Sequence, residues 1–287
     1  MKIHELHKGF TIGFPTWNRL NYVKACVESI IKNSAFEHEI IVHINGCTDG
    51  TVEWATDMKN KYSFFDYTYS DKNLGVVLGH NIAINKGTKD VVLISDNDIL
   101  FFPGWDIELV NFAENNDADK KWWINSTPIE PRGDSPSCIA PMNYGTTIEE
   151  FNWDAVLLDI NYLRGFKKSV NSNVCPALLW RDSFDSINGL NEELGLGLGA
   201  EDDFAFRMWK HVGCRNFVTV PNSLVYHFAA GLSGVQSWPD RQSHMNFRDN
   251  YFIQKYAMCK EEFIFNILRR GKPWTKDGMV SYEQYKK

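Results

Sequence analysis

The sequence lacks a surplus of basic residues. Its 30 Lys and Arg residues are outnumbered by 36 Asp and Glu residues, and the formal net charge is −6. Proteins that bind nucleic acids need clustered cations to neutralise phosphates, because this contribution supplies much of their affinity. We therefore expect no nucleic-acid partner.

Paired cysteines are also missing. No CxxC pair and no zinc-finger spacing occurs among the six cysteines, which are Cys26, Cys47, Cys138, Cys175, Cys214 and Cys259. Cysteines scattered in this way argue against a structural zinc site and against a disulfide framework. We interpret them as reduced thiols, which are typical of a cytoplasmic protein.

Long apolar runs are absent. The first eight residues lack the apolar core of a signal peptide, and no stretch approaches the roughly 18 apolar residues that span a bilayer. We expect a soluble, cytoplasmic chain. The apolar and basic stretch Phe263–Trp274 leaves two interpretations open, namely peripheral contact with an anionic membrane or a helix packed on the catalytic domain.

A regular alternation of strand and helix patterns occupies the first hundred residues. The apolar spacing predicts four strands separated by three helices, with strands at Phe10–Thr16, Glu39–Asn45, Phe65–Tyr69 and Asp90–Ser95 and helices at Asn18–Asn33, Thr51–Tyr62 and Gly79–Gly87. This order predicts an α/β fold with a mostly parallel sheet and helices on both faces. Ligands of such sheets bind beyond the carboxyl ends of the strands.

The second half of the chain is less regular. Residues Thr127–Thr147 are rich in proline and glycine and predict a long loop, which would serve as a lid or an acceptor-binding loop. A helix is expected from Glu201 to Val212, followed by two short strands at Phe217–Val220 and Leu224–His227. A helical tail is expected from Met245 to Arg270.

Two carboxylates stand directly after the fourth predicted strand. Asp96 and Asp98 are separated by Asn97, and this spacing suits a hard divalent cation such as Mn²⁺ or Mg²⁺ whose shell a diphosphate completes. Such a cation neutralises the charge that develops on a departing nucleotide diphosphate. The alternative is a chance occurrence in a turn.

A second acidic group, Glu201–Asp203, opens a predicted helix after a glycine-rich loop. Acids in a first helical turn also cap free N–H groups and complement the helix dipole. Three in a row exceed what capping needs, and one of them is a candidate general base. His227, which ends a predicted strand, is either a packed histidine or a metal ligand.

Seven motifs in sequence order resemble those of inverting glycosyltransferases with the GT-A fold, especially glycosyltransferase family 2 and its galactosyltransferase-like relatives. The matching segments of this sequence are, in order, Pro15–Arg19, Asn45–Thr51, Asn73–Gly75, Asp96–Asp98, Asn188–Glu192, Glu201–Arg207 and Val220–His227. They are similar, in the same order, to the family's patterns P-T-x-N-R, D-G-S-T-D-G-T, N-L-G, D-x-D, G-G-F-D-E, E-D…R and V-P…Y-H. The matches span residues 10 to about 230.

This resemblance implies one GT-A catalytic domain over 1–235 and a C-terminal helical extension over 236–287. The domain would divide into a nucleotide-sugar-binding half at about 8–102 and an acceptor half at 103–235. The implied nucleotide-sugar contacts are Pro15, Thr16, Arg19, Asn45, Asn73, Gly75, Asn81, Asp96 and Asn97. The implied metal ligands are Asp96, Asp98 and His227.

The resemblance also assigns catalytic roles to the second acidic group. Asp202 becomes the general base, Glu201 orients the acceptor and Asp203 supports the helix start, with an exchange of roles between Asp202 and Asp203 left open. The implied reaction moves a sugar from a nucleotide-diphosphate sugar to a hydroxyl of a glycan or glycoconjugate. A UDP-sugar is favoured as donor, although Asn45 stands where the family usually has Asp.

Two other functions remain as alternatives. A noncatalytic nucleotide- or glycan-binding module would use the same fold. A sugar-1-phosphate nucleotidyltransferase would also combine an α/β fold with carboxylates and a metal, but the glycine-rich, basic N-terminal signature expected for it is absent.

Overall fold

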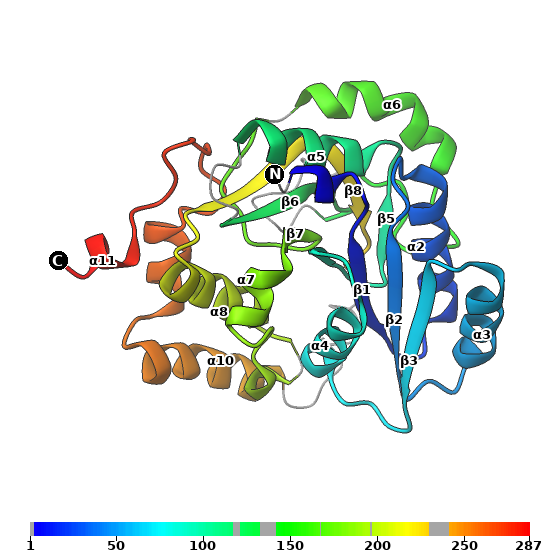
Figure 1. Cartoon of the computed structure of the whole chain (residues 1–287), viewed down its shortest axis with the longest axis horizontal. Coiled ribbons are helices and arrows are strands. Elements are labelled where there is room, and N and C mark those ends of the chain that lie inside the picture. The colour runs from blue at the N-terminus through cyan, green and yellow to red at the C-terminus, as the bar shows by residue number, and fades with distance from the viewer. Residues whose placement is uncertain (1–2, 117–120, 133–141, 167, 196, 230–240) are drawn as a thin grey trace.

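A single eight-stranded sheet organises the protein in the computed structural model, which describes residues 3–116, 121–132, 142–166, 168–195, 197–229 and 241–287. The strand order is β3-β2-β1-β4-β7-β6-β8-β5 (Figure 1). The strands are β1 Thr11–Thr16, β2 Glu39–Asn45, β3 Phe65–Ser70, β4 Val91–Ile94, β5 Ile99–Phe101, β6 Trp122–Ile129, β7 Ala177–Trp180 and β8 Asn216–His227.

Helices cover both faces of this sheet (Figure 1). The longer ones are α2 Leu20–Asn33, α3 Thr51–Lys61, α4 Val76–Lys86, α5 Trp105–Asn116, α6 Trp153–Phe166, α8 Ala200–Arg207 and α10 Arg241–Tyr256. Shorter helical segments are α1 Ile3–Leu6, α7 Arg181–Ser186, the 3₁₀ turn Glu192–Leu194, the π-helical turns Met208–Val212 and Glu262–Ile267, and α11 Tyr282–Tyr285.

Alternating side chains of the central strands enter two separate cores. In β4, Val91 and Leu93 pack with α2, α3 and α5, whereas Val92 and Ile94 pack with α4, α7 and α8. A strand that is buried on both faces consists of consecutive apolar residues, so β4 can be predicted from the sequence. The predicted strands of the first half are confirmed, and α4 begins at Val76 rather than at Gly79.

The second half differs from the sequence prediction in several elements. The two short strands predicted between residues 217 and 227 form one strand, β8, which pairs with β6 through a register shift between Ser126 and Thr127. The start of the predicted loop belongs to β6 as far as Ile129, and residues 133–141 of that loop lie outside the described ranges. The predicted helix at 201–212 is α-helical only to Arg207 and continues as a π-helical turn.

The C-terminal segment packs on the sheet's helical layer. Phe263, Ile264, Ile267 and Leu268 are buried in the same core as α8, so the packed-helix interpretation of this stretch holds for these four side chains. None of the described helices is long and apolar enough to cross a bilayer.

Candidate active site

The carboxyl ends of β1 and β4 meet at one edge of the sheet, because both strands run parallel. The Asn97 amide donates to Thr16 Oγ1 at 2.8 Å, so the turn after β4 is fastened to the end of β1. Arg19 follows β1, and its Nη1 lies 4.0 Å from Asp98 Oδ2. The structure therefore brings together four of the residues that the sequence predicted for donor and metal binding.

Asn45, Asn73 and Gly75 also meet, but they bind one another. Asn45 Nδ2 donates to Asn73 Oδ1 at 2.9 Å and to the Gly75 carbonyl at 3.1 Å, while Asn45 Oδ1 accepts from the Leu74 N–H. Gly75 has φ +91, and a Cβ there would lie 2.5 Å from the Gly195 carbonyl oxygen. This cluster shapes the loop between β3 and α4 and holds it against the glycine-rich loop before α8.

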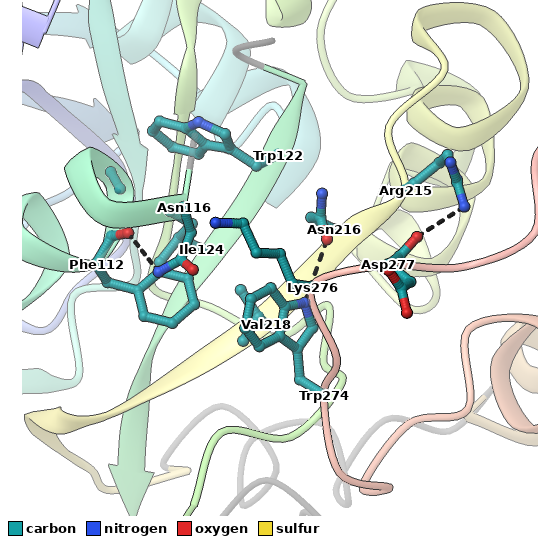
Figure 2. A pocket seen from close by; sticks show the side chains of 11 residues that line it. Phe112, Asn116, Trp122, Ile124, Arg215, Asn216, Val218, Trp274, Lys276 and Asp277 are labelled. Carbon is teal, nitrogen blue, oxygen red and sulfur yellow. Dashed lines mark hydrogen bonds between the residues drawn. The ribbon is translucent and has the colours of Figure 1, made fainter. Parts of the chain in front are cut away.

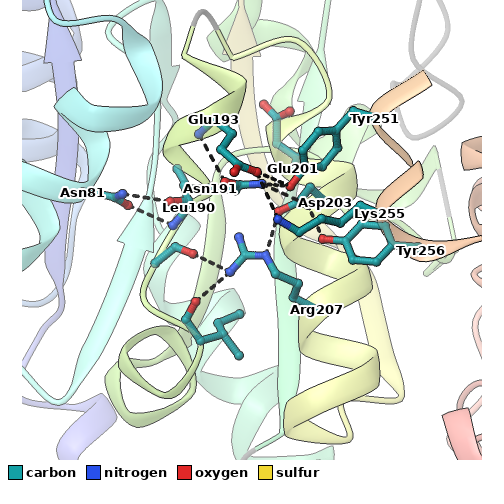
Figure 3. Close-up of polar contacts among 12 residues, drawn as sticks. Asn81, Leu190, Asn191, Glu193, Glu201, Asp203, Arg207, Tyr251, Lys255 and Tyr256 are labelled. Carbon is teal, nitrogen blue, oxygen red and sulfur yellow. Dashed lines mark hydrogen bonds and ion pairs between the residues drawn. The ribbon is translucent and has the colours of Figure 1, made fainter. Parts of the chain in front are cut away.

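Asn81 lies beneath the same region. Its amide donates to the Leu190 carbonyl at 2.9 Å and to Glu192, and its oxygen accepts from the Leu190 N–H at 2.9 Å (Figure 3). Asn81 is buried in α4. The side chain therefore fixes the Asn188–Glu192 segment to the donor half.

Asp96 sits beside a buried histidine. His80 Nε2 lies 3.6 Å from Asp96 Oδ1 and 2.7 Å from the Ser95 carbonyl oxygen. Burial and the neighbouring Asp98 carboxylate raise the pKa of Asp96, although His80 and His227 oppose this shift. Without a further cation, burial and the Asp98 carboxylate therefore destabilise the ionised form of Asp96.

Asp98 faces His227 across the pairing of β5 with β8. His227 Nε2 lies 3.6 Å from Asp98 Oδ1, and His227 Nδ1 lies 2.7 Å from Glu130 Oε1. Burial lowers the pKa of His227, but Asp98 and Glu130 outweigh it and raise that pKa to about 9. Glu130 thus orients the ring so that Nε2 points at Asp98, an arrangement that is common behind metal-bound histidines.

A divalent cation needs oxygen or nitrogen ligands that converge on one point. Asp98 and His227 offer a carboxylate and an imidazole with a carboxylate behind it, which is a donor set that Mn²⁺ accepts. Within the described ranges, no three His, Cys, Asp or Glu side chains are grouped closely enough to hold a metal by themselves. The protein residues fit a metal that shares its shell with another ligand.

The three acids at the start of α8 have different surroundings. Asp203 is fully buried, and its carboxylate accepts from Arg207 Nε at 2.7 Å, from the Tyr256 hydroxyl and from Asn191 Nδ2 (Figure 3). These partners come from α8, from α10 and from the turn before α8. Asp203 therefore joins α8 and the turn before it to α10.

Asp202 points to a different group of residues. Its Oδ1 accepts from Asn173 Nδ2 at 3.0 Å and from Arg270 Nη2. Asp202 is only 8% exposed, and the Arg270 side chain is also largely covered. Among the described residues, both hydrogen bonds of the Asp202 carboxylate are made to Oδ1 and none to Oδ2.

Glu201 connects the two acidic groups. Burial is the main cause that raises its pKa from 4.5 to about 7, and the carboxylates of Asp96 and Asp202 add to the shift. A carboxyl group that titrates near neutral pH within a cleft is a frequent property of functional sites. Asp96 at the strand end therefore lies close enough to Glu201 at the helix start to affect its pKa.

Replacing Glu201 by Gln is expected to stabilise the metal-free protein at alkaline pH. The native state keeps the Glu201 proton up to about pH 7, whereas the unfolded chain loses it near 4.5. Stability therefore falls as the pH rises between these values, by at most about 3 kcal/mol. Urea unfolding at pH 5 and pH 8 in EDTA should show that Glu201→Gln removes part of this fall, whereas Glu53→Gln, an exposed site on α3, leaves it unchanged.

Three residues of this site were not found by sequence reasoning. Glu130 lies in a stretch that the sequence predicted as loop, Asn173 lies in an irregular segment before β7, and Arg270 lies in the C-terminal segment. No local motif marks any of them. Their roles arise from contacts with residues that are far away in the sequence.

A cavity of about 210 Å³ lies elsewhere, at the opposite end of β8 from His227 (Figure 2). Its lining includes the aromatic residues Phe112, Trp122 and Trp274 and the basic residues Arg215 and Lys276. Twelve residues of β8 separate the two ends, roughly 35 Å at the rise of an extended strand. This cavity is therefore distinct from the acidic site.

Comparisons with known proteins extend this description. Residues 11–124 match the family model described as Glycosyl transferase family 2. The match covers the half that carries the strand-end acids, and it confirms the resemblance inferred from the motifs there. No match was found among curated proteins.

Solved structures share the fold at low sequence identity. Residues 1–349 of TarS from S. aureus, in complex with UDP-GlcNAc, give a TM-score of 0.55 at 12% identity over 89% of this chain and 75% of that one. The mannosyltransferase PcManGT from Pyrobaculum calidifontis, in complex with GDP-Man and Mn2+, gives 0.57 at 16% identity over 86% and 64%. The chain spans 48% of the longer TarS structure, with a TM-score of 0.56 and 13% identity.

Proposed function

We propose that this chain, a GT-A protein with a family-2 glycosyltransferase segment over residues 11–124, transfers a sugar from a nucleotide-diphosphate sugar to an acceptor hydroxyl with inversion. The observation that carries the proposal is the electrostatic interaction between Asp96 at the strand edge and Glu201 at the start of α8, where Asp202 is the next residue. A donor diphosphate and an attacking hydroxyl need these two kinds of group side by side.

The donor would lie at the carboxyl edge of β1 and β4. Thr16, Arg19, Asp96 and Asn97 would contact the nucleotide, because they lie in or beside the turn after β4. Pro15, which precedes Thr16 in β1, would contribute from the same strand. Asn45, Asn73, Gly75 and Asn81 would act indirectly, since their polar groups already hold the surrounding loops. Similar structures bind UDP, UDP-GlcNAc and GDP-Man, and we favour a UDP-sugar here.

Asp98 and His227, together with Asp96, would hold Mn²⁺ or Mg²⁺ with the donor diphosphate. When bound, the ion would neutralise charge on the leaving diphosphate. Arg19 would add a fixed positive charge beside Asp98. Glu130 would keep the His227 ring in the orientation that presents Nε2.

Asp202 would accept the proton of the acceptor hydroxyl through Oδ2. The hydroxyl oxygen attacks the anomeric carbon and forms the new glycosidic bond, while the bond from that carbon to the diphosphate oxygen breaks. The bonding electron pair leaves with the diphosphate. This displacement inverts the anomeric centre and needs no covalent enzyme intermediate.

Asp98→Ala is expected to weaken metal-dependent nucleotide binding at least tenfold, because it removes a ligand and an orienting partner of His227. Isothermal titration with UDP, GDP, CDP and dTDP, with and without Mn²⁺, tests this and identifies the base. Asp57→Ala, an exposed acid on α3, is the matched control. Absence of binding by the wild type under every condition would favour the noncatalytic module instead.

A further inference from the structure

The C-terminal segment reaches the centre of the candidate active site. Arg270 stands 68 residues after Asp202 in the sequence, and its Nη2 donates to Asp202 Oδ1. Arg270 Nε also donates to Asn173 Oδ1 at 2.8 Å, and Asn173 Nδ2 donates to the same Asp202 oxygen at 3.0 Å. Three side chains therefore form a closed ring of hydrogen bonds that occupies one carboxylate oxygen and spares the other.

Backbone contacts fix both partners of Asp202 in place. The segment at 269–274, which carries Arg270, runs antiparallel to the segment at 169–173, which carries Asn173. The hydrogen bonds between them join the Asn171 N–H to the Lys272 carbonyl at 2.9 Å, the Gly271 N–H to the Asn171 carbonyl at 2.9 Å and the Trp274 N–H to the Ser169 carbonyl at 3.0 Å. Residues 169–173 are in turn bonded to β8 through the Ser172 N–H and the Thr219 N–H.

Two adjacent arginines have different environments in this turn. Arg269 adopts φ +60, a left-handed conformation that side-chain-bearing residues rarely take, and its side chain is exposed. Arg270 is partly buried and enters the hydrogen-bonded ring. The fold thus holds an unfavourable backbone conformation at the position that turns Arg270 toward Asp202.

The charges around Asp202 explain why a cation is needed. Asp202 is nearly buried, and the carboxyls of Glu201 and Asp96 belong to the same site. Burying a carboxylate costs free energy unless a positive group pairs with it. The planar guanidinium both supplies the charge and restricts the rotamer, which an ammonium group does less well.

We propose that Arg270, together with Asn173, is a positioning residue that holds Asp202 through Oδ1 and leaves its Oδ2 for the acceptor hydroxyl. This inference rests on the proposed function, because it assumes that Asp202 is the base. A base whose orientation is fixed by a third group is a general feature of activated sites. The C-terminal segment then completes the active site.

Hydrolysis of UDP-GlcNAc and GDP-mannose tests the proposal, since water takes the place of the acceptor. Arg270→Gln is expected to lower kcat about 10- to 100-fold with KM for the donor changed less than about twofold, because the donor contacts lie on the other half. Arg270→Lys should restore part of kcat, because it returns the positive charge but not the planar fork.

Arg269→Gln is the matched control, because it removes the same charge one residue away without touching Asp202. It should behave as the wild type. Thermal unfolding must show that each variant is folded, and Arg270→Gln should have no further effect on kcat in an Asp202→Asn background.

The outcomes separate the two proposals. If Asp202→Asn abolishes hydrolysis while Arg270→Gln leaves kcat unchanged, the positioning role is wrong and the proposed function stands. If Arg270→Gln raises KM alone, Arg270 binds the donor and the positioning role is again wrong. A wild type that hydrolyses neither donor overturns both.

Discussion

Asp202→Asn is expected to lower kcat by about 10²- to 10⁴-fold, the range that a positioned general base contributes. The amide keeps the size of the side chain and can still accept from Asn173 and Arg270, but it cannot take the proton of the acceptor. Steady-state release of UDP or GDP from the donor measures the effect. Nucleotide affinity should remain unchanged, because the donor contacts lie at the strand edge.

The comparison with Glu201 makes this test specific. Glu201 shares the site and has a pKa near neutrality, so it is the competing candidate for the base. If Glu201→Gln abolished turnover while Asp202→Asn retained more than about a third of it, the two roles would have to be exchanged. The expected result is a moderate loss of kcat for Glu201→Gln and a severe loss for Asp202→Asn.

Asp203→Asn is expected to destabilise the protein by about 3–5 kcal/mol, the usual cost of breaking a buried ion pair from one side. Asp203 is fully buried, and Arg207 would keep its charge without the carboxylate. Burial and the Asp203 carboxylate together raise the pKa of Tyr256. In the variant, the Tyr256 hydroxyl would lose this charged acceptor. Urea unfolding of the metal-free protein measures the change.

Asp249→Asn provides the control for this prediction. Asp249 lies on α10, pairs with Arg248 and has a side chain that is 46% exposed. Exposed pairs contribute little, so its effect should stay within about 0.5 kcal/mol. An equal effect of both substitutions would show that the contacts of Asp203 with Asn191, Arg207 and Tyr256 contribute little to stability.

The donor half could be predicted because its signals are local. Apolar runs such as Val91–Ile94, and the acids that follow them, can be recognised from a few consecutive residues. Parallel pairing of the strands then places these acids at one edge of the sheet. The strand β5 escaped prediction because it has three residues, which is too short to show a period. The strand β8 was divided in two because Pro221 interrupts a pattern that the structure continues.

The environments of Asp202 and Asp203 could not be told apart from sequence. The side chains of adjacent helix residues point about 100° apart, so the two carboxylates meet different partners. The neighbouring sequence does not show which partners these are. Asp203 meets α10 through Tyr256, and Asp202 meets Asn173 and Arg270. Each of these partners is more than 25 residues away in the sequence, and only the tertiary fold brings them near.

The antiparallel contact between residues 169–173 and 269–274 also fixes the order in which the site becomes complete during synthesis. Translation proceeds from the N-terminus, so Asp202 leaves the ribosome 68 residues before its guanidinium partner. The residues proposed to contact the donor, the last of which is Asn97, are therefore synthesised well before the arginine proposed to position the base.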